Sequence, residues 1–124
     1  MNKLEYIPGD LGTYNGNIVT IENSDGYYAT YYDEDEFLQE INVNVIKGIP
    51  LTPEILEKNG WKRDGKWYCL STKRAYLYTT QDAEQPDEFL ICAGECKHNL
   101  TSVRFVHQLQ HFLFGLNLNS NLEV

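Results

Sequence analysis

The chain has 124 residues, of which 42% are hydrophobic and 13% aromatic, and its formal net charge at pH 7 is −8. A chain of this length and apolar content can bury a core, which excludes a wholly disordered protein. Residues 1–60 carry three Lys and eleven Asp and Glu, whereas residues 61–124 carry seven basic and seven acidic residues. Because clustered Lys and Arg hold a phosphate backbone, we expect no nucleic-acid binding through the acidic half.

The sequence also predicts a cytoplasmic protein. It has no apolar run near the roughly 20 residues that a membrane span needs, so no membrane partner is expected. The segment from Met1 to Tyr6 lacks the apolar stretch of a signal peptide. The three cysteines (Cys69, Cys92 and Cys96) are an odd number, which argues against a disulfide framework.

The first half of the chain predicts short antiparallel strands joined by tight turns. Asn15-Gly16 and Asp25-Gly26 are hairpin-turn signals, because the favoured two-residue turns need positive φ angles. Strand-prone runs occupy residues 17–22, 27–32 and 41–45.

The capping residues around positions 52–60 predict a short helix. Thr52 is a favourable N-cap, and Pro53 suits the first helical position, where its missing N–H is not needed. Leu51 and Leu56 occupy the two positions of a hydrophobic staple. Gly60 can adopt the left-handed conformation that ends a helix.

A second set of strands and a longer helix are expected after residue 60. Asp64-Gly65 predicts a hairpin, and further strands are expected at residues 75–79 and 89–92. Apolar periodicity predicts a helix over residues 101–116, with a stripe that packs on this second sheet and with His107 and His111 on the opposite side. The stripe consists of Phe105, Val106, Leu109, Phe112, Leu113 and Leu116. The polar tail, residues 117–124, is expected to fray.

Together these elements predict an α+β fold in one domain, residues 1–124. Its expected order is a small N-terminal antiparallel sheet or SH3-like barrel, a short linker helix, a second antiparallel sheet and a C-terminal amphipathic helix. Two sub-units are expected within it, residues 1–48 and residues 49–124.

Residues 49–61 read IPLTPEILEKNGW, and residues 106–110 read VHQLQ, followed by Phe112 and Leu113. These two segments resemble the "PLTPEIL-x-K-x-G-aromatic" helix and the closing "VHQLQ" helix of small, uncharacterised proteins of gut Bacteroides-type bacteria and their phages. The resemblance implies the same order of elements and a phage or mobile-element origin, and it carries no catalytic residues.

Four residues, Cys92, Cys96, His107 and His111, approach the spacing of a Cys2His2 zinc site, with His98 as a substitute ligand. Ten residues separate Cys96 from His107, where the usual gap is about twelve. Cys92 also falls in an apolar strand, where a free thiol behaves as a small hydrophobic side chain. We therefore favour buried thiols and surface imidazoles over a metal site, and we expect no cofactor.

No motif predicts an enzyme. A Cys–His pair such as Cys96 with His107 lacks the local signature of a nucleophilic enzyme. The chain has no Walker-type glycine loop and no dinucleotide fingerprint.

The Tyr-rich strand and the acidic run beside it form the candidate binding patch. Tyr is enriched in interface hot spots, and an acidic surface steers basic proteins toward it. The simpler interpretation, which we favour over a binding patch, is a two-sided strand followed by an acidic, solubilising loop. Imitation of DNA phosphates is a third interpretation. The candidate patch comprises Tyr28, Tyr32, Asp33, Glu34, Asp35 and Glu36.

The sequence thus predicts a non-enzymatic binding or accessory protein of phage or mobile-element origin that contacts a protein partner. The alternative is a small cytosolic enzyme or nucleotide-sequestering protein. That alternative needs a pocket between the two sheets, flanked by His107, Trp67 or Arg104. The oligomeric state is left open.

Overall fold

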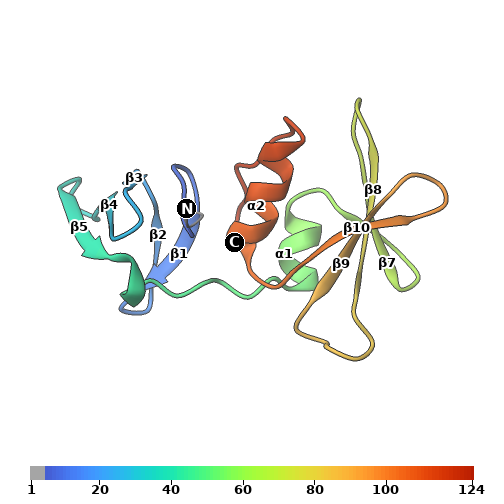
Figure 1. Cartoon of the computed structure of the whole chain (residues 1–124), viewed down its shortest axis with the longest axis horizontal. Helices are drawn as coiled ribbons and strands as arrows, with labels where there is room; N and C mark the ends of the chain where they lie inside the picture. Colours follow the sequence, from blue (N-terminus) through green and yellow to red (C-terminus); the bar gives the residue numbers. More distant parts are fainter. Residues whose placement is uncertain (1–4) are drawn as a thin grey trace. The chain divides into compact units, whose positions relative to one another are not determined.

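The computed structural model describes residues 5–124, which group into two units (Figure 1). Unit 1 holds the described residues up to Ile49 together with Val106–Asn121, and unit 2 holds Pro50–Phe105 with Leu122–Val124. Their antiparallel sheets have two, three and five strands, with a short helix between them in the chain and a second helix near the C-terminus. The predicted α+β class is therefore confirmed.

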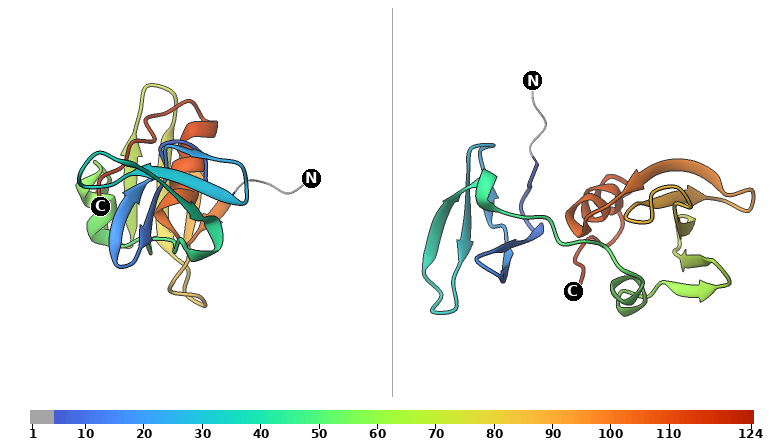
Figure 2. Two further views of the ribbon diagram at one scale, coloured as in Figure 1. Left: turned by 90° about the vertical axis from the view of Figure 1, so that its left-hand side faces the viewer. Right: turned by 90° about the horizontal axis from the view of Figure 1, so that it is seen from below.

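Unit 1 contains two small sheets. In the first, β1 (Leu11–Tyr14) pairs with β2 (Asn17–Thr20). The second has the order β3 (Asn23–Ser24), β4 (Tyr28–Tyr32) and β5 (Leu38–Asn42), and Figure 2 shows β4 and β5 as a long hairpin coloured cyan to teal. The core of the unit is formed by Tyr6, Val19, Ile21, Ala29 and Ile46.

The predicted strand at residues 41–45 is wrong in its second half. β5 ends at Asn42, and Val43–Val45 form a 3₁₀ turn, η1. The Asn42 side-chain oxygen accepts a hydrogen bond from the backbone N–H of Asn44 at 2.8 Å. This cap competes with the sheet for the backbone, as short polar side chains commonly do.

The segment after η1 returns to β1. Lys47 and Thr13 exchange backbone hydrogen bonds of 2.8 and 2.9 Å. Gly12 permits this approach, since a Cβ atom at that position would lie 2.7 Å from Cγ2 of Ile46.

Unit 2 begins with α1 (Pro53–Lys58) and continues as a five-stranded antiparallel sheet. The sheet has the order β10-β9-β8-β7-β6, so each strand pairs with its neighbour in the chain. The strands are β6 (Lys62–Asp64), β7 (Trp67–Ser71), β8 (Tyr76–Gln81), β9 (Phe89–Ala93) and β10 (His98–Val103).

The caps predicted for α1 are confirmed. The Thr52 hydroxyl accepts a hydrogen bond from Ile55 N–H at 3.2 Å. At the other end, Gly60 has φ +93°, and the N–H of Trp61 reaches the carbonyl of Leu56 at 3.0 Å. This is the Schellman pattern, and it places the buried Leu56 and Trp61 at the positions that usually pack together.

The C-terminal helix is shorter than predicted, because α2 spans Val106–Gly115 and residues 98–103 form β10. Gly94 and Lys97 have positive φ angles and close the β9–β10 turn through a hydrogen bond of 3.0 Å. The β-branched Val103 then pairs with Phe89 in the sheet. Sheet pairing thus outweighs the apolar period that predicted a longer helix.

α2 belongs to unit 1, whereas the predicted sub-units placed it with the second sheet. The side chain of Gln110 is buried and accepts a hydrogen bond from Leu11 N–H at 2.9 Å. Its amide group also donates to the carbonyls of Gly9 and Ser120 at 3.0 and 3.1 Å. A polar position of the helix therefore bonds the backbone of unit 1, which apolar periodicity alone does not reveal.

The end of the chain is held rather than frayed. Asn59 and Glu123 exchange two hydrogen bonds of 2.7 and 2.8 Å, and the ammonium group of Lys58 donates to the Val124 carbonyl at 3.0 Å. These bonds tie the last residues to the end of α1 within unit 2.

Candidate functional site

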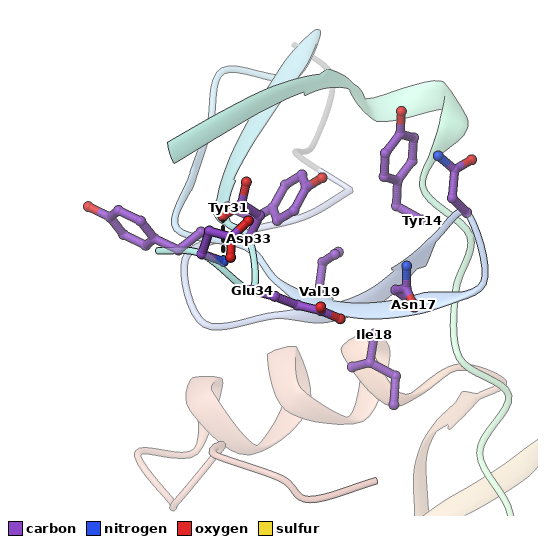
Figure 3. Close-up of a pocket in the computed structure, with 10 residues that line it drawn as sticks. Tyr14, Asn17, Ile18, Val19, Tyr31, Asp33 and Glu34 are labelled. Carbon is purple, nitrogen blue, oxygen red and sulfur yellow. Dashed lines mark hydrogen bonds between the residues drawn. The ribbon is translucent and has the colours of Figure 1, made fainter. Parts of the chain in front are cut away.

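A groove of about 470 Å³ lies on unit 1 between the β1–β2 turn and the end of β4 (Figure 3). We call it the acidic tyrosine groove. Figure 3 shows Tyr31, Asp33 and Glu34 on one side, and Tyr14 and Asn17 on the other. Its lining consists of Tyr14, Asn15, Asn17, Ile18, Val19, Tyr31, Tyr32, Asp33, Glu34 and Asp35.

The side of the groove that holds Tyr14 and Asn17 is formed by the predicted hairpin turn between β1 and β2. Asn15 and Gly16 have φ angles of +52° and +79°, as the tight turn between β1 and β2 requires. Tyr14 ends β1 directly before the turn. Tyr14 and Asn17 are register partners across the two strands.

An aromatic pair connects the two sides of the groove, with Tyr14 from one side and Tyr31 from the other. The centroids of Tyr14 and Tyr31 are 6.1 Å apart with an interplanar angle of 58°, a favourable geometry for an aromatic pair. Both side chains are half-buried and pack against the core of unit 1. They are therefore held in place before any ligand binds.

Asp33 organises the acidic turn between β4 and β5. One of its carboxylate oxygens accepts hydrogen bonds from Asp35 N–H and Phe37 N–H, both at 2.9 Å. The other oxygen accepts from the Gln39 amide at 2.8 Å. The hydrogen bond from Phe37 N–H contributes most to lowering the pKa of Asp33, and the bonds from Gln39 and Asp35 add to it. The Asp33 carboxylate therefore stays charged at neutral pH.

The same turn exposes apolar side chains. Tyr32 and Leu38 are register partners across β4 and β5, and each is 56% exposed. Phe37 is 67% exposed. Large apolar groups beside carboxylates at a hairpin tip are typical of an interaction surface.

The structure divides the predicted patch. Tyr32, Asp33, Glu34 and Asp35 line the acidic tyrosine groove. Glu36 occupies the turn with a φ angle of +65°. Tyr28 lies at the other end of β4 in a second groove of about 280 Å³, whose further lining is Asn23, Ser24, Asp25, Thr30 and Glu40.

Sequence reasoning missed the wall formed by β1 and β2. Tyr14 and Asn17 flank the Asn15-Gly16 turn that the sequence predicts, so the turn itself was a usable signal. Tyr31 was also missed, since alternation along β4 assigns it to the side opposite Tyr32. Both residues nevertheless line the groove at the end of β4.

The zinc alternative draws on both units. Cys92 is buried and Cys96 exposed in unit 2, whereas His107 and His111 lie on α2 in unit 1. Burial raises the pKa of the Cys92 thiol. Within residues 5–124, no group of three or more His, Cys, Asp and Glu side chains is arranged to hold a metal ion.

The prediction that His107 lies at the surface is wrong, because its side chain is buried. Its Nε2 atom lies 2.7 Å from Glu5 Oε1, and its ring centroid lies 4.6 Å from that of Tyr6. His111, on the next turn, pairs with the buried carboxylate of Asp10. Glu5 and Asp10, which precede β1, thus supply one carboxylate to each imidazole of α2.

The residues named for the pocket-bearing alternative have local partners. Trp67 packs edge-on to Tyr78 at 6.3 Å in unit 2, with the Lys97 ammonium group 4.7 Å from the Tyr78 centroid. Arg104 pairs with Glu88 in the same unit. His107 belongs to unit 1.

Among the helices formed by residues 5–124, none has the length and apolar character needed to span a membrane. No family model, no curated protein and no solved structure matches the chain.

Proposed function

We propose that this chain is a non-enzymatic, cytoplasmic binding protein of phage or mobile-element origin, and that it contacts a basic protein partner through the β4–β5 hairpin of unit 1. The observation that carries the proposal is the pairing of exposed Tyr32, Phe37 and Leu38 with a run of carboxylates on one turn. Apolar anchors supply binding energy, and the charges around them steer the partner.

The charge of unit 1 supports a basic partner. Residues 1–49 hold two Lys and nine Asp and Glu, and residues 106–121 hold no Lys, Arg, Asp or Glu, so these segments together carry a charge of −7. Among the described residues, none of the ion pairs uses Glu34, Asp35 or Glu36. These three carboxylates are exposed and available to a partner.

The test neutralises these three carboxylates and keeps Asp33, whose hydrogen bonds shape the turn. The variant Glu34→Gln, Asp35→Asn, Glu36→Gln is compared with a control that removes three exposed carboxylates of unit 2, namely Glu84→Gln, Asp87→Asn, Glu95→Gln. Both variants change the net charge equally.

Affinity capture from a bacterial host lysate, followed by calorimetry with the purified captured protein, gives the readout. We expect the hairpin variant and Phe37→Ser to lose binding, the control to keep it, and wild-type binding to weaken with added salt. Equal binding by the wild type and the hairpin variant would overturn the proposal.

A further inference from the structure

We propose that the acidic tyrosine groove takes the guanidinium group of an arginine side chain from the partner. This inference rests on the proposed function and names the group that the groove recognises. It differs from a general attraction between acidic and basic surfaces, because it predicts that arginine and lysine are distinguished.

The paired tyrosine rings suit a flat cation. Tyr14 and Tyr31 come from opposite sides of the groove, and because their rings are tilted toward each other they present a continuous aromatic surface rather than a slot between parallel rings. Tyr32 lines the same groove and is 56% exposed. A guanidinium stacks on such ring faces and is more weakly hydrated than an ammonium group, so it loses less on leaving water.

The polar lining suits the edge of the same cation. Asp33 already accepts three hydrogen bonds, which leaves Glu34 and Asp35 to accept from the guanidinium N–H groups. The side-chain amides of Asn15 and Asn17 add oxygen acceptors on the opposite wall. The planar guanidinium has five N–H donors and can bond acceptors on two sides of the groove at once. The compact ammonium group of lysine is less suited to this arrangement.

Size and charge agree with this occupant. The groove volume of about 470 Å³ falls within the range of ligand sites, roughly 300–1,000 Å³. Among the described residues that line it, none is Lys or Arg, so no cation of its own occupies the lining. The groove is preorganised by the Asp33 hydrogen bonds and by the Tyr14–Tyr31 pair.

The experiment titrates the ¹⁵N-labelled 124-residue chain with capped nonapeptides. Each peptide has two test residues spaced by Gly and Ser, and the test residue is arginine, lysine, trimethyllysine or citrulline. We expect the arginine peptide to bind roughly tenfold more tightly than the lysine peptide, with shifts in the amides of residues 14–18 and 31–36. The citrulline peptide, which keeps the shape and loses the charge, should not bind.

Variants separate stacking from charge. Tyr32→Leu should reduce the arginine preference to about twofold or less while leaving binding salt-dependent, and Tyr32→Phe, which keeps the ring face, should retain the preference. Tyr32 is suited to this test because its exposed side chain contributes little to the core. The Glu84, Asp87 and Glu95 control variant should bind like the wild type.

The outcomes distinguish this inference from the proposed function. Equal affinity for arginine and lysine peptides, lost in the Glu34, Asp35 and Glu36 variant, would overturn arginine recognition and leave the acidic interface standing. Tighter binding of trimethyllysine than of arginine would also overturn it. If no peptide binds while a captured protein still needs the hairpin, the groove is not the recognition element. If neither binds, both proposals fail.

Discussion

Replacing Leu56 by Ala tests how α1 is held in unit 2. Leu56 is 0% exposed, and its neighbours in the staple and in the Schellman motif, Leu51 and Trp61, are 5% and 2% exposed. The change removes about three carbons, worth roughly 2.4 kcal/mol at about 0.8 kcal/mol each, and leaves a cavity that raises the cost to about 3–5 kcal/mol.

That cost is large for a unit of this size. Unit 2 holds 59 residues, for which the usual range of stability gives about 3–9 kcal/mol. We therefore expect Leu56→Ala to bring unit 2 close to its unfolding midpoint in the absence of denaturant. The fold of unit 1 is not expected to change directly, because Leu56 lies outside it.

Tryptophan fluorescence during urea unfolding measures this cost. Both tryptophans of the chain, Trp61 and Trp67, lie in unit 2, so the signal reports that unit. Glu57→Ala on the exposed face of the same helix is the control and should leave the midpoint nearly unchanged. A loss below about 1 kcal/mol for Leu56→Ala would refute the packing described for α1.

Three further predictions concern single side chains. Thr52→Ala should cost about 1 kcal/mol in the same urea assay, whereas Thr52→Ser keeps the cap and should cost much less; equal costs would contradict the cap. Gly12→Ala should cost about 1–3 kcal/mol by circular dichroism, because its Cβ would meet Ile46. In a double-mutant cycle, Ile46→Ala should relieve part of that cost, and strict additivity would exclude the clash. Burial, followed by the charges of Glu5 and Asp10, raises the pKa of Tyr6 to about 12 from 10.0. Since the folded state disfavours the phenolate, stability should fall as pH rises from 10 to 12, and Tyr6→Phe should lose less over that interval in urea titrations. Parallel pH profiles would show that the Tyr6 phenol does not differ between the folded and unfolded states.

Local signals were predicted well because they act over a few residues. The ends of α1 are marked by Thr52, Pro53 and Gly60, and the first hairpin turn is formed by Asn15-Gly16. Caps and turns can be predicted because they depend on backbone angles and near neighbours. The acidic run at residues 33–36 was correctly placed at a turn. The sequence did not show that Asp33 builds this turn with its side chain.

The grouping of elements required the tertiary structure. The sequence places His107 opposite the apolar stripe, and Gln110 is another polar residue of the same helix, yet both are buried against residues about a hundred positions earlier in the chain. Hydrophobic periodicity alone cannot reveal that a polar side chain is buried, because it identifies the apolar face of a helix and carries no information about a polar partner elsewhere in the chain. For the same reason, the sequence did not show that α2 belongs to unit 1.

By itself, the sequence determined the α+β class, the short capped helix, the hairpin turns and the uneven charge, because each follows from local conformation or composition. The tertiary structure decided which of the exposed groups meet. It brought Tyr14 and Tyr31 together, set Tyr32 and the acidic turn beside them, and placed Tyr28 in another groove. The physical reason is that the groove is formed by strands of two different sheets, whose separation in space depends on how the sheets curl and pair.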